Sequence, residues 1–83
     1  MYSKSIQSHR IAGLFRAPDF VQLACRWNCS LRVQNNHGTY DPKSIMAMMS
    51  FNPKDGAITV FGDGSDEKDA VESLVDFLIA MSD

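Results

Sequence analysis

The sequence has no hydrophobic run that approaches the roughly 20 apolar residues of a membrane-spanning helix. Its first ten residues, MYSKSIQSHR, lack the apolar core of a secretory signal. Positive charge is also scarce, because 8 Lys and Arg face 10 Asp and Glu, for a net charge of -2. Nucleic-acid binding requires a basic surface for contacts to phosphates. We therefore expect a cytoplasmic protein that binds neither a membrane nor, directly, a nucleic acid.

Cysteine and histidine are too few to indicate a metal site. Cys25 and Cys29 lie four residues apart, but no second pair of ligands accompanies them, and His9 and His37 lie in unrelated contexts. We predict that both thiols are in or near the core. The sequence also lacks a nucleophile–base pair, and GDGSD at residues 62–66 is explained by a turn into a helix. These absences predict no metal, no cofactor and no enzymatic activity.

The sequence does contain enough apolar material for one small domain. With 83 residues, of which 45% are hydrophobic, we expect a single domain over residues 1–83. A domain of this size buries only about 60% of the surface of its unfolded chain, so its core has little to spare. No internal repeat, low-complexity tract or linker divides the chain.

Short segments with strand and helix patterns alternate along the chain. The sequence CSLRVQ alternates apolar and polar side chains, and AITVF is β-branched and aromatic, as strands are. NNHG at residues 35–38 predicts the turn of a hairpin. The predicted strands lie at residues 2–8, 29–34, 39–41 and 57–61, and the helices at residues 18–27, 44–51 and around 70–81. The resulting order is β-α-β-β-α-β-α, which predicts an α+β fold.

Start signals mark two of the helices. Pro18 suits the first helical position, and Asp19 suits the positive end of the helix dipole. Ser44 suits an N-cap, because its hydroxyl can accept from the N–H groups of the first turn.

The apolar helix at residues 44–51 offers side chains to two surfaces. Met48 is predicted in the core, because methionines at helical spacing usually pack inward. Ile45 is expected either in the core or in an exposed apolar patch with Met46 and Met49. Methionine suits such a patch because its side chain is flexible and polarisable. Exposure of Met46 or Met49 would therefore indicate a surface that binds a partner.

The segment order and three motifs resemble HPr, the histidine-containing phosphocarrier family of the bacterial sugar phosphotransferase system. KSIMAMMS at residues 43–50 is similar to the segment around the regulatory serine in HPr proteins of Gram-positive type. GDGSDEKDAVESLVDFL at residues 62–78 resembles the family's last turn and helix, and GLFRAP at residues 13–18 resembles its active-site turn, Gly-Leu-His-x-Arg-Pro-Ala. The resemblance implies an open-faced β-sandwich, with four antiparallel strands in the order 1-4-2-3 and three helices on one face.

The same resemblance implies that the carrier chemistry is lost. The family's phosphoryl-accepting histidine falls on Phe15, and the arginine that helps to hold the phosphate falls on Ala17. Formation of phosphohistidine needs an imidazole nitrogen as the nucleophile, which phenylalanine lacks. Arg16 is displaced by one residue, or about 100° of helix rotation. Asp19 adds a negative charge where the phosphate would bind.

A regulatory feature of the family is retained. Ser44 matches the serine that a dedicated kinase phosphorylates in HPr and in its relative without the histidine, the catabolite-repression HPr-like protein. The resemblance therefore implies a non-catalytic regulatory protein. Its expected partners are HPr kinase and a transcriptional regulator or components of the phosphotransferase system. The residues expected to bind a partner are Phe15, Arg16, Lys43, Ile45, Met46 and Met49.

Several alternatives remain at these positions. Phe15 either packs inward or lies outward beside Arg16 as an anchor for a partner. Ser44 is either a simple helix cap or a phosphorylation site. His9 offers a substitute acceptor for a working phosphocarrier, and a protein-binding module that retains only the fold is a third possibility. The weakly patterned first strand leaves both a monomer and a strand-swapped dimer open.

Overall fold

The structure is a computed structural model that describes residues 1–7, 16–51 and 56–80. Its elements follow the predicted order of strands and helices. They are β1 (Tyr2–Gln7), α1 (Ala17–Ala24), β2 (Ser30–Asn35), β3 (Gly38–Tyr40), α2 (Ile45–Ser50), β4 (Ala57–Asp63) and α3 (Glu67–Ala80). The expectations for His9 and Phe15, and the predicted last residue of the third helix, lie outside the described residues.

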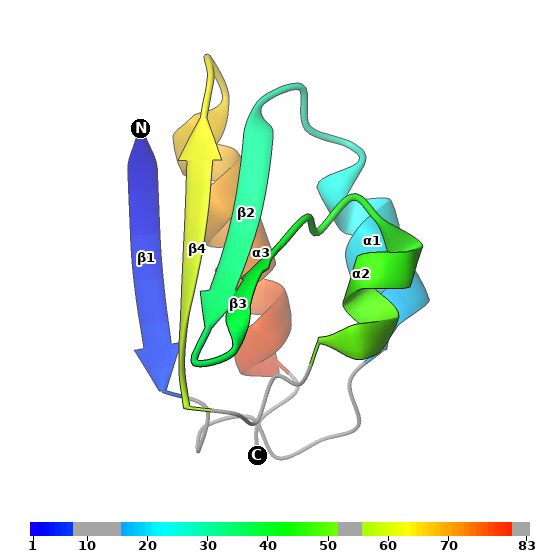
Figure 1. Cartoon of the computed structure of the whole chain (residues 1–83). Helices are drawn as coiled ribbons and strands as arrows, with labels where there is room; N and C mark the ends of the chain where they lie inside the picture. Colours follow the sequence, from blue (N-terminus) through cyan, green and yellow to red (C-terminus); the bar gives the residue numbers. More distant parts are fainter. Residues whose placement is uncertain (8–15, 52–55, 81–83) are drawn as a thin grey trace.

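The four strands form one antiparallel sheet in the order β1-β4-β2-β3, as predicted (Figure 1). In this register Ile6 lies opposite Ile58, and Val33 lies opposite Val60. Burial alternates along β2 and β4, so that apolar side chains such as Leu31 point to one face of the sheet and polar ones to the other. This alternation allows a single layer of helices to complete the core.

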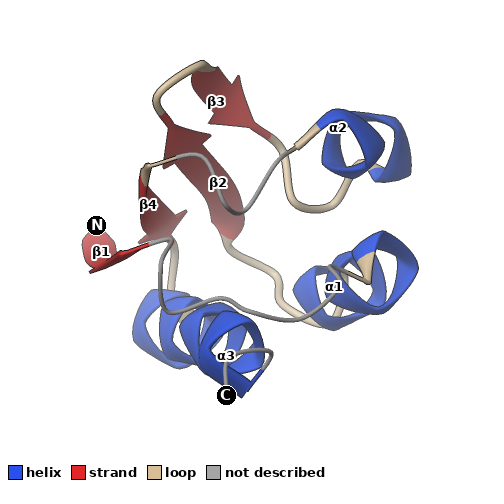
Figure 2. Ribbon diagram, turned by 90° about the horizontal axis from the view of Figure 1, so that it is seen from below, coloured by secondary structure: helices blue, strands red, loops and turns tan. Residues whose placement is uncertain are grey.

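The three helices lie on one side of the sheet and leave its other side uncovered by any described helix (Figure 2). α3 packs against β1 and β4, and α1 packs against α2 and α3. The rings of Phe20 in α1 and Phe77 in α3 are 5.4 Å apart. The buried stripe of α3 consists of Ala70, Val71, Leu74, Val75 and Leu78. The fold is therefore the expected open-faced α+β sandwich.

α1 ends three residues before its predicted limit. The amide of Cys25 still bonds to Val21 four residues earlier, but Arg26 and Trp27 bond to carbonyls only three residues earlier. The last turn is thus tightened, and the chain leaves the helix axis before Trp27. Pro18 is the second helical residue, since the helix begins at Ala17.

The prediction that both thiols lie in or near the core is correct for one cysteine only. Cys29 is buried, whereas Cys25 is exposed on the last turn of α1. Cys25 lies one residue beyond buried Ala24, and one residue rotates a side chain by about 100° around a helix.

Asp66 joins the start of β2 to the start of α3. Its carboxylate accepts hydrogen bonds from the backbone N–H groups of Asn28, at 3.0 Å, and Cys29, at 3.1 Å. These bonds, that from Asn28 foremost, lower the pKa of Asp66 below its ordinary value of 3.8. Burial and the neighbouring Asp66 carboxylate raise the pKa of the Cys29 thiol.

We expect Asp66→Asn to remove part of the protein's acid sensitivity. A carboxyl group whose pKa is lowered by folding stabilises the folded state above its unfolded pKa, and this contribution is lost as the pH falls through the folded value. The wild type should therefore lose more stability than Asp66→Asn when the pH is lowered below about 4. Urea unfolding at a series of pH values measures this difference.

Asp69→Asn is the matched control, because it also removes a carboxylate from the first turn of α3. It measures how far the loss of any carboxylate from this turn changes the acid sensitivity. Equal losses of stability in the wild type and Asp66→Asn would contradict a stabilising role for the charged Asp66.

Candidate functional site

Ser44 is the N-cap of α2, as predicted. Its backbone is extended, and its hydroxyl oxygen accepts a hydrogen bond from the N–H of Ala47 at 3.3 Å. The N–H of Ser44 donates to the carbonyl of Asp41 at 3.0 Å, and the carbonyl of Ser44 accepts the first bond of the helix, from Met48. The main chain and the hydroxyl of Ser44 are therefore both held by hydrogen bonds, to the preceding turn and to the first turn of the helix. Its phosphorylation stays a prediction.

The outer surface of α2 carries exposed apolar side chains. Met46 is 76% exposed, Met49 is 73% exposed and Ile45 is 41% exposed, and we call these three residues the α2 patch. Met48 is buried at 1% exposure, as predicted. The alternative that Ile45 lies in the core is wrong, because Ile45 precedes Met49 by four residues and shares its helix face. The patch lies immediately after the Ser44 cap.

Lys43 directs its ammonium group to the main chain. Its Nζ donates to the carbonyls of Trp27 and Cys29, both at 2.8 Å. These carbonyls lie in the segment that connects α1 to β2, so the lysine ties the start of α2 to that connection. Sequence reasoning placed Lys43 among the partner-binding residues, and the two bonds show that its charged end already has partners within the chain.

The N-terminal turn of α1 is exposed and polar. Arg16 is its N-cap residue without a side-chain capping bond, and its guanidinium lies 3.6 Å from the carboxylate of Asp19. Both side chains are largely exposed, so this pair contributes little to stability. Ala17 is half-buried at the first helical position. The described turn therefore presents a cation and an anion close together.

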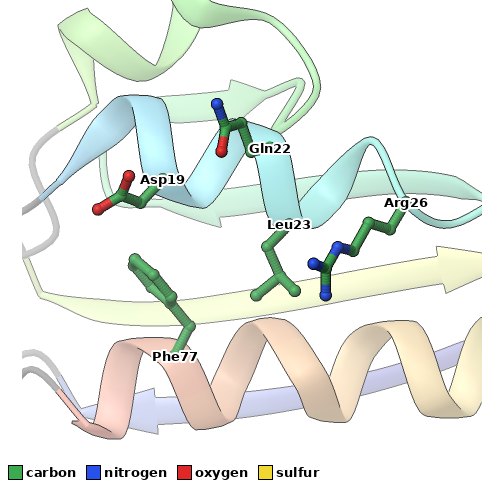
Figure 3. A pocket seen from close by; sticks show the side chains of 5 residues that line it. All are labelled: Asp19, Gln22, Leu23, Arg26 and Phe77. Carbon is green, nitrogen blue, oxygen red and sulfur yellow. The ribbon is translucent and has the colours of Figure 1, made fainter.

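Sequence reasoning missed a groove of about 380 Å³ between α1 and α3. Leu23 and Phe77 point into the space between the two helices, and Arg26 extends over it (Figure 3). Asp19 and Gln22 complete its lining. The groove is lined by residues more than fifty positions apart in sequence, so no local sequence pattern predicts it.

Metal-binding geometry is absent from the described segments, residues 1–7, 16–51 and 56–80. No group of three or more His, Cys, Asp or Glu side chains in them is arranged to hold an ion. The same segments contain no helix long and apolar enough to cross a membrane.

Comparison with known families decides what kind of domain carries this site. Residues 16–80 match the family model described as PTS HPr component phosphorylation site. The chain belongs to the HPr family. This membership was predicted from motifs, and it relates the protein to the phosphotransferase system.

Individual HPr-family proteins are similar over most of the chain. The HPr-like protein Crh of Halalkalibacterium halodurans is 32% identical, and the match covers 94% of this chain and 96% of that protein. HPr-C-His from Thermoanaerobacter tengcongensis is 27% identical with a TM-score of 0.80, over 98% of this chain and 94% of that chain. The catabolite repression protein Crh of Bacillus subtilis, described as a dimer with a swapped domain, is 30% identical with a TM-score of 0.67. That match covers 80% of this chain and 79% of the Bacillus chain.

Two adjacent methionines in α2 provide a direct test of its inner and outer faces. We expect Met48→Ala to destabilise the protein by about 2–5 kcal/mol, because it opens a cavity in the core. Met49→Ala should change the stability by no more than about 0.5 kcal/mol, because this side chain is mostly exposed. Thermal unfolding of both variants measures the difference. A large loss in Met49→Ala would show that the α2 patch serves the fold rather than a partner.

Proposed function

We propose that this HPr-family protein is a non-enzymatic regulator in carbon catabolite control that is phosphorylated on Ser44 and binds a protein partner through the α2 patch. The observation that carries the proposal is the exposure of Met46 and Met49 directly beside the capping serine. Burial of a large apolar side chain stabilises a folded protein by about 1.5–3 kcal/mol, so leaving two of them exposed gives up stability in a domain with a small core. Their place on the surface is explained when a partner covers them.

Phosphorylation of Ser44 would change the surface beside this patch. A phosphate adds about -1.5 to -2 charges at neutral pH, together with three strong acceptor oxygens. The protein has a formal net charge of only -2, so the modification would nearly double it. An apolar centre with a polar rim is the usual construction of a protein–protein interface. One partner could thus recognise the phosphorylated serine and the α2 patch in a single interface.

Loss of the carrier activity is the second part of the proposal. Phe15, at the position of the family's histidine, has no nucleophile to accept a phosphoryl group. Arg16 lies beside Asp19 rather than alone, so its charge is already partly balanced at the start of α1. Ala17 offers no donor at the position of the family's arginine. These features support regulation without phosphoryl transfer.

The proposed partners follow from the family. They are HPr kinase, which would modify Ser44, and a transcriptional regulator or a component of the phosphotransferase system, which would bind the α2 patch with Phe15 and Arg16. We place this interaction in the cytoplasm and assign it to residues 1–83 as one domain. One relative supports the proposed role in carbon catabolite control, since the Bacillus subtilis protein is described as a catabolite repression protein.

Phosphorylation with two donors tests the proposal. We expect HPr kinase with ATP to add one phosphate to Ser44, located by intact mass and fragment mapping. The first enzyme of the phosphotransferase system with phosphoenolpyruvate should add none, because Phe15 lacks a nucleophile.

Ser44→Ala should abolish the modification, and Ser50→Ala is the matched control, because Ser50 is an exposed serine in the same helix. Phosphate transferred from phosphoenolpyruvate would make the protein a carrier with another acceptor, such as His9. No phosphate from either donor would leave a protein-binding module and refute the regulatory role of Ser44.

A further inference from the structure

The connection between α1 and β2 lies between two opposite charges. On one side the ammonium of Lys43 donates to the carbonyls of Trp27 and Cys29, at 2.8 Å each. On the other side the carboxylate of Asp66 accepts from the N–H groups of Asn28 and Cys29, at 3.0 and 3.1 Å. We call Lys43, residues 27–29 and Asp66 the charge clamp. It joins the start of α2 to the start of α3 through three residues of main chain.

One peptide group of the clamp contacts both charges. The carbonyl of Trp27 and the N–H of Asn28 belong to the same peptide unit, so its negative end meets the ammonium and its positive end meets the carboxylate. A hydrogen bond with an ionised partner is about twice as strong as a neutral one. Bonds in such a chain also polarise one another, so the loss of either charge weakens the contact at the opposite end.

The clamp ends one residue from the capping serine. The backbone N–H of Lys43 donates to the Asp41 side chain at 2.9 Å, and the next N–H, that of Ser44, donates to the Asp41 carbonyl. Lys43 is thus fixed at both its main chain and its ammonium group. The side chain that bonds the connection between α1 and β2 therefore belongs to the residue directly before Ser44.

We propose that Lys43 is a positioning residue that holds Ser44 in its capping geometry, and that Asp66 supports it from the other end of the charge clamp. This inference rests on the proposed function only where it concerns the kinase. It assigns Lys43 a role different from a direct contact with a partner. A serine that is already ordered needs less further ordering when a kinase binds it, so the clamp should favour modification.

Amide hydrogen exchange tests the clamp without any kinase. The reporter is the N–H of Ala47, which donates to the hydroxyl of Ser44. We expect this amide to exchange about tenfold faster in both Lys43→Met and Asp66→Ala, because each variant removes a charged partner. Lys68→Met and Asp69→Ala are the matched controls: they remove the same charges from exposed positions of α3, and they should leave the exchange unchanged.

The Asp66→Ala result is decisive, because this residue lies at the far end of the clamp from Ser44. Exchange at Ala47 equal to that in Asp69→Ala would overturn the proposal, even if Lys43→Met had an effect. Circular dichroism and a urea unfolding transition at near-neutral pH confirm that each variant is folded before the comparison. Lys43→Arg keeps the positive charge and several donors, and it should restore slow exchange at Ala47.

The kinase assay then separates positioning from contact. If Lys43 acts by positioning, Lys43→Met and Asp66→Ala should both lower kcat/KM for phosphorylation of Ser44, by a similar factor of about ten. If Lys43 only contacts the kinase, Lys43→Met alone should raise KM, and the positioning role is refuted. Absence of phosphate on the wild type would refute the proposed function, while the exchange experiment would still decide whether the clamp positions Ser44.

Discussion

Two opposite charges determine how the chain passes from α1 into the sheet. After α1 the backbone must turn away from the helix axis and enter β2, and the peptide groups of such a turn find few partners within regular structure. Lys43 and Asp66 supply these partners from elements that lie far apart in sequence. Because polar main-chain groups in a compact domain need hydrogen bonds, this arrangement fixes the position of the turn and, with it, the spacing of α1, α2 and α3. The buried faces of these helices can then meet the sheet.

The same arrangement explains why α2 can carry an exposed apolar surface. The helix has only six residues, too few to be stable alone, and within it only Met48 is buried. Its position therefore comes from the packing of Met48 in the core and from its start, where Ser44 caps the first turn and the preceding residue, Lys43, is bonded to the connection between α1 and β2. With the ends fixed, the outer side chains contribute little to folding, and their chemistry is free to serve recognition. An apolar patch on a helix held in this way loses little conformational entropy when a partner covers it.

Local patterns predicted the order of strands and helices, the resemblance to HPr implied the order of strands in the sheet, and tertiary contacts account for the rest. The alternation of Leu31 and Val33 and the capping serine each express a rule that acts over a few residues, and each was predicted correctly. The exposure of Cys25 and the early end of α1 depend on where the chain goes next, which no local spacing records. The two bonds from Lys43 to the carbonyls of Trp27 and Cys29 depend on two segments that meet only in the folded protein. A lysine beside a serine therefore resembled a surface residue in the sequence, although its charge is used internally.

The position of the core relative to α1 shows how an HPr-family protein can change its chemistry and keep its fold. Full burial begins at Phe20 and Ala17 is half-buried, whereas Arg16, Pro18 and Asp19 are exposed. Substitutions at these exposed positions change the charge and chemistry of the turn and remove nothing from the core. The fully buried contacts of α1 come from Phe20 onward, and the charge clamp lies beyond its last turn. The chemistry of these exposed positions can thus change with little effect on the core or on the α2 patch.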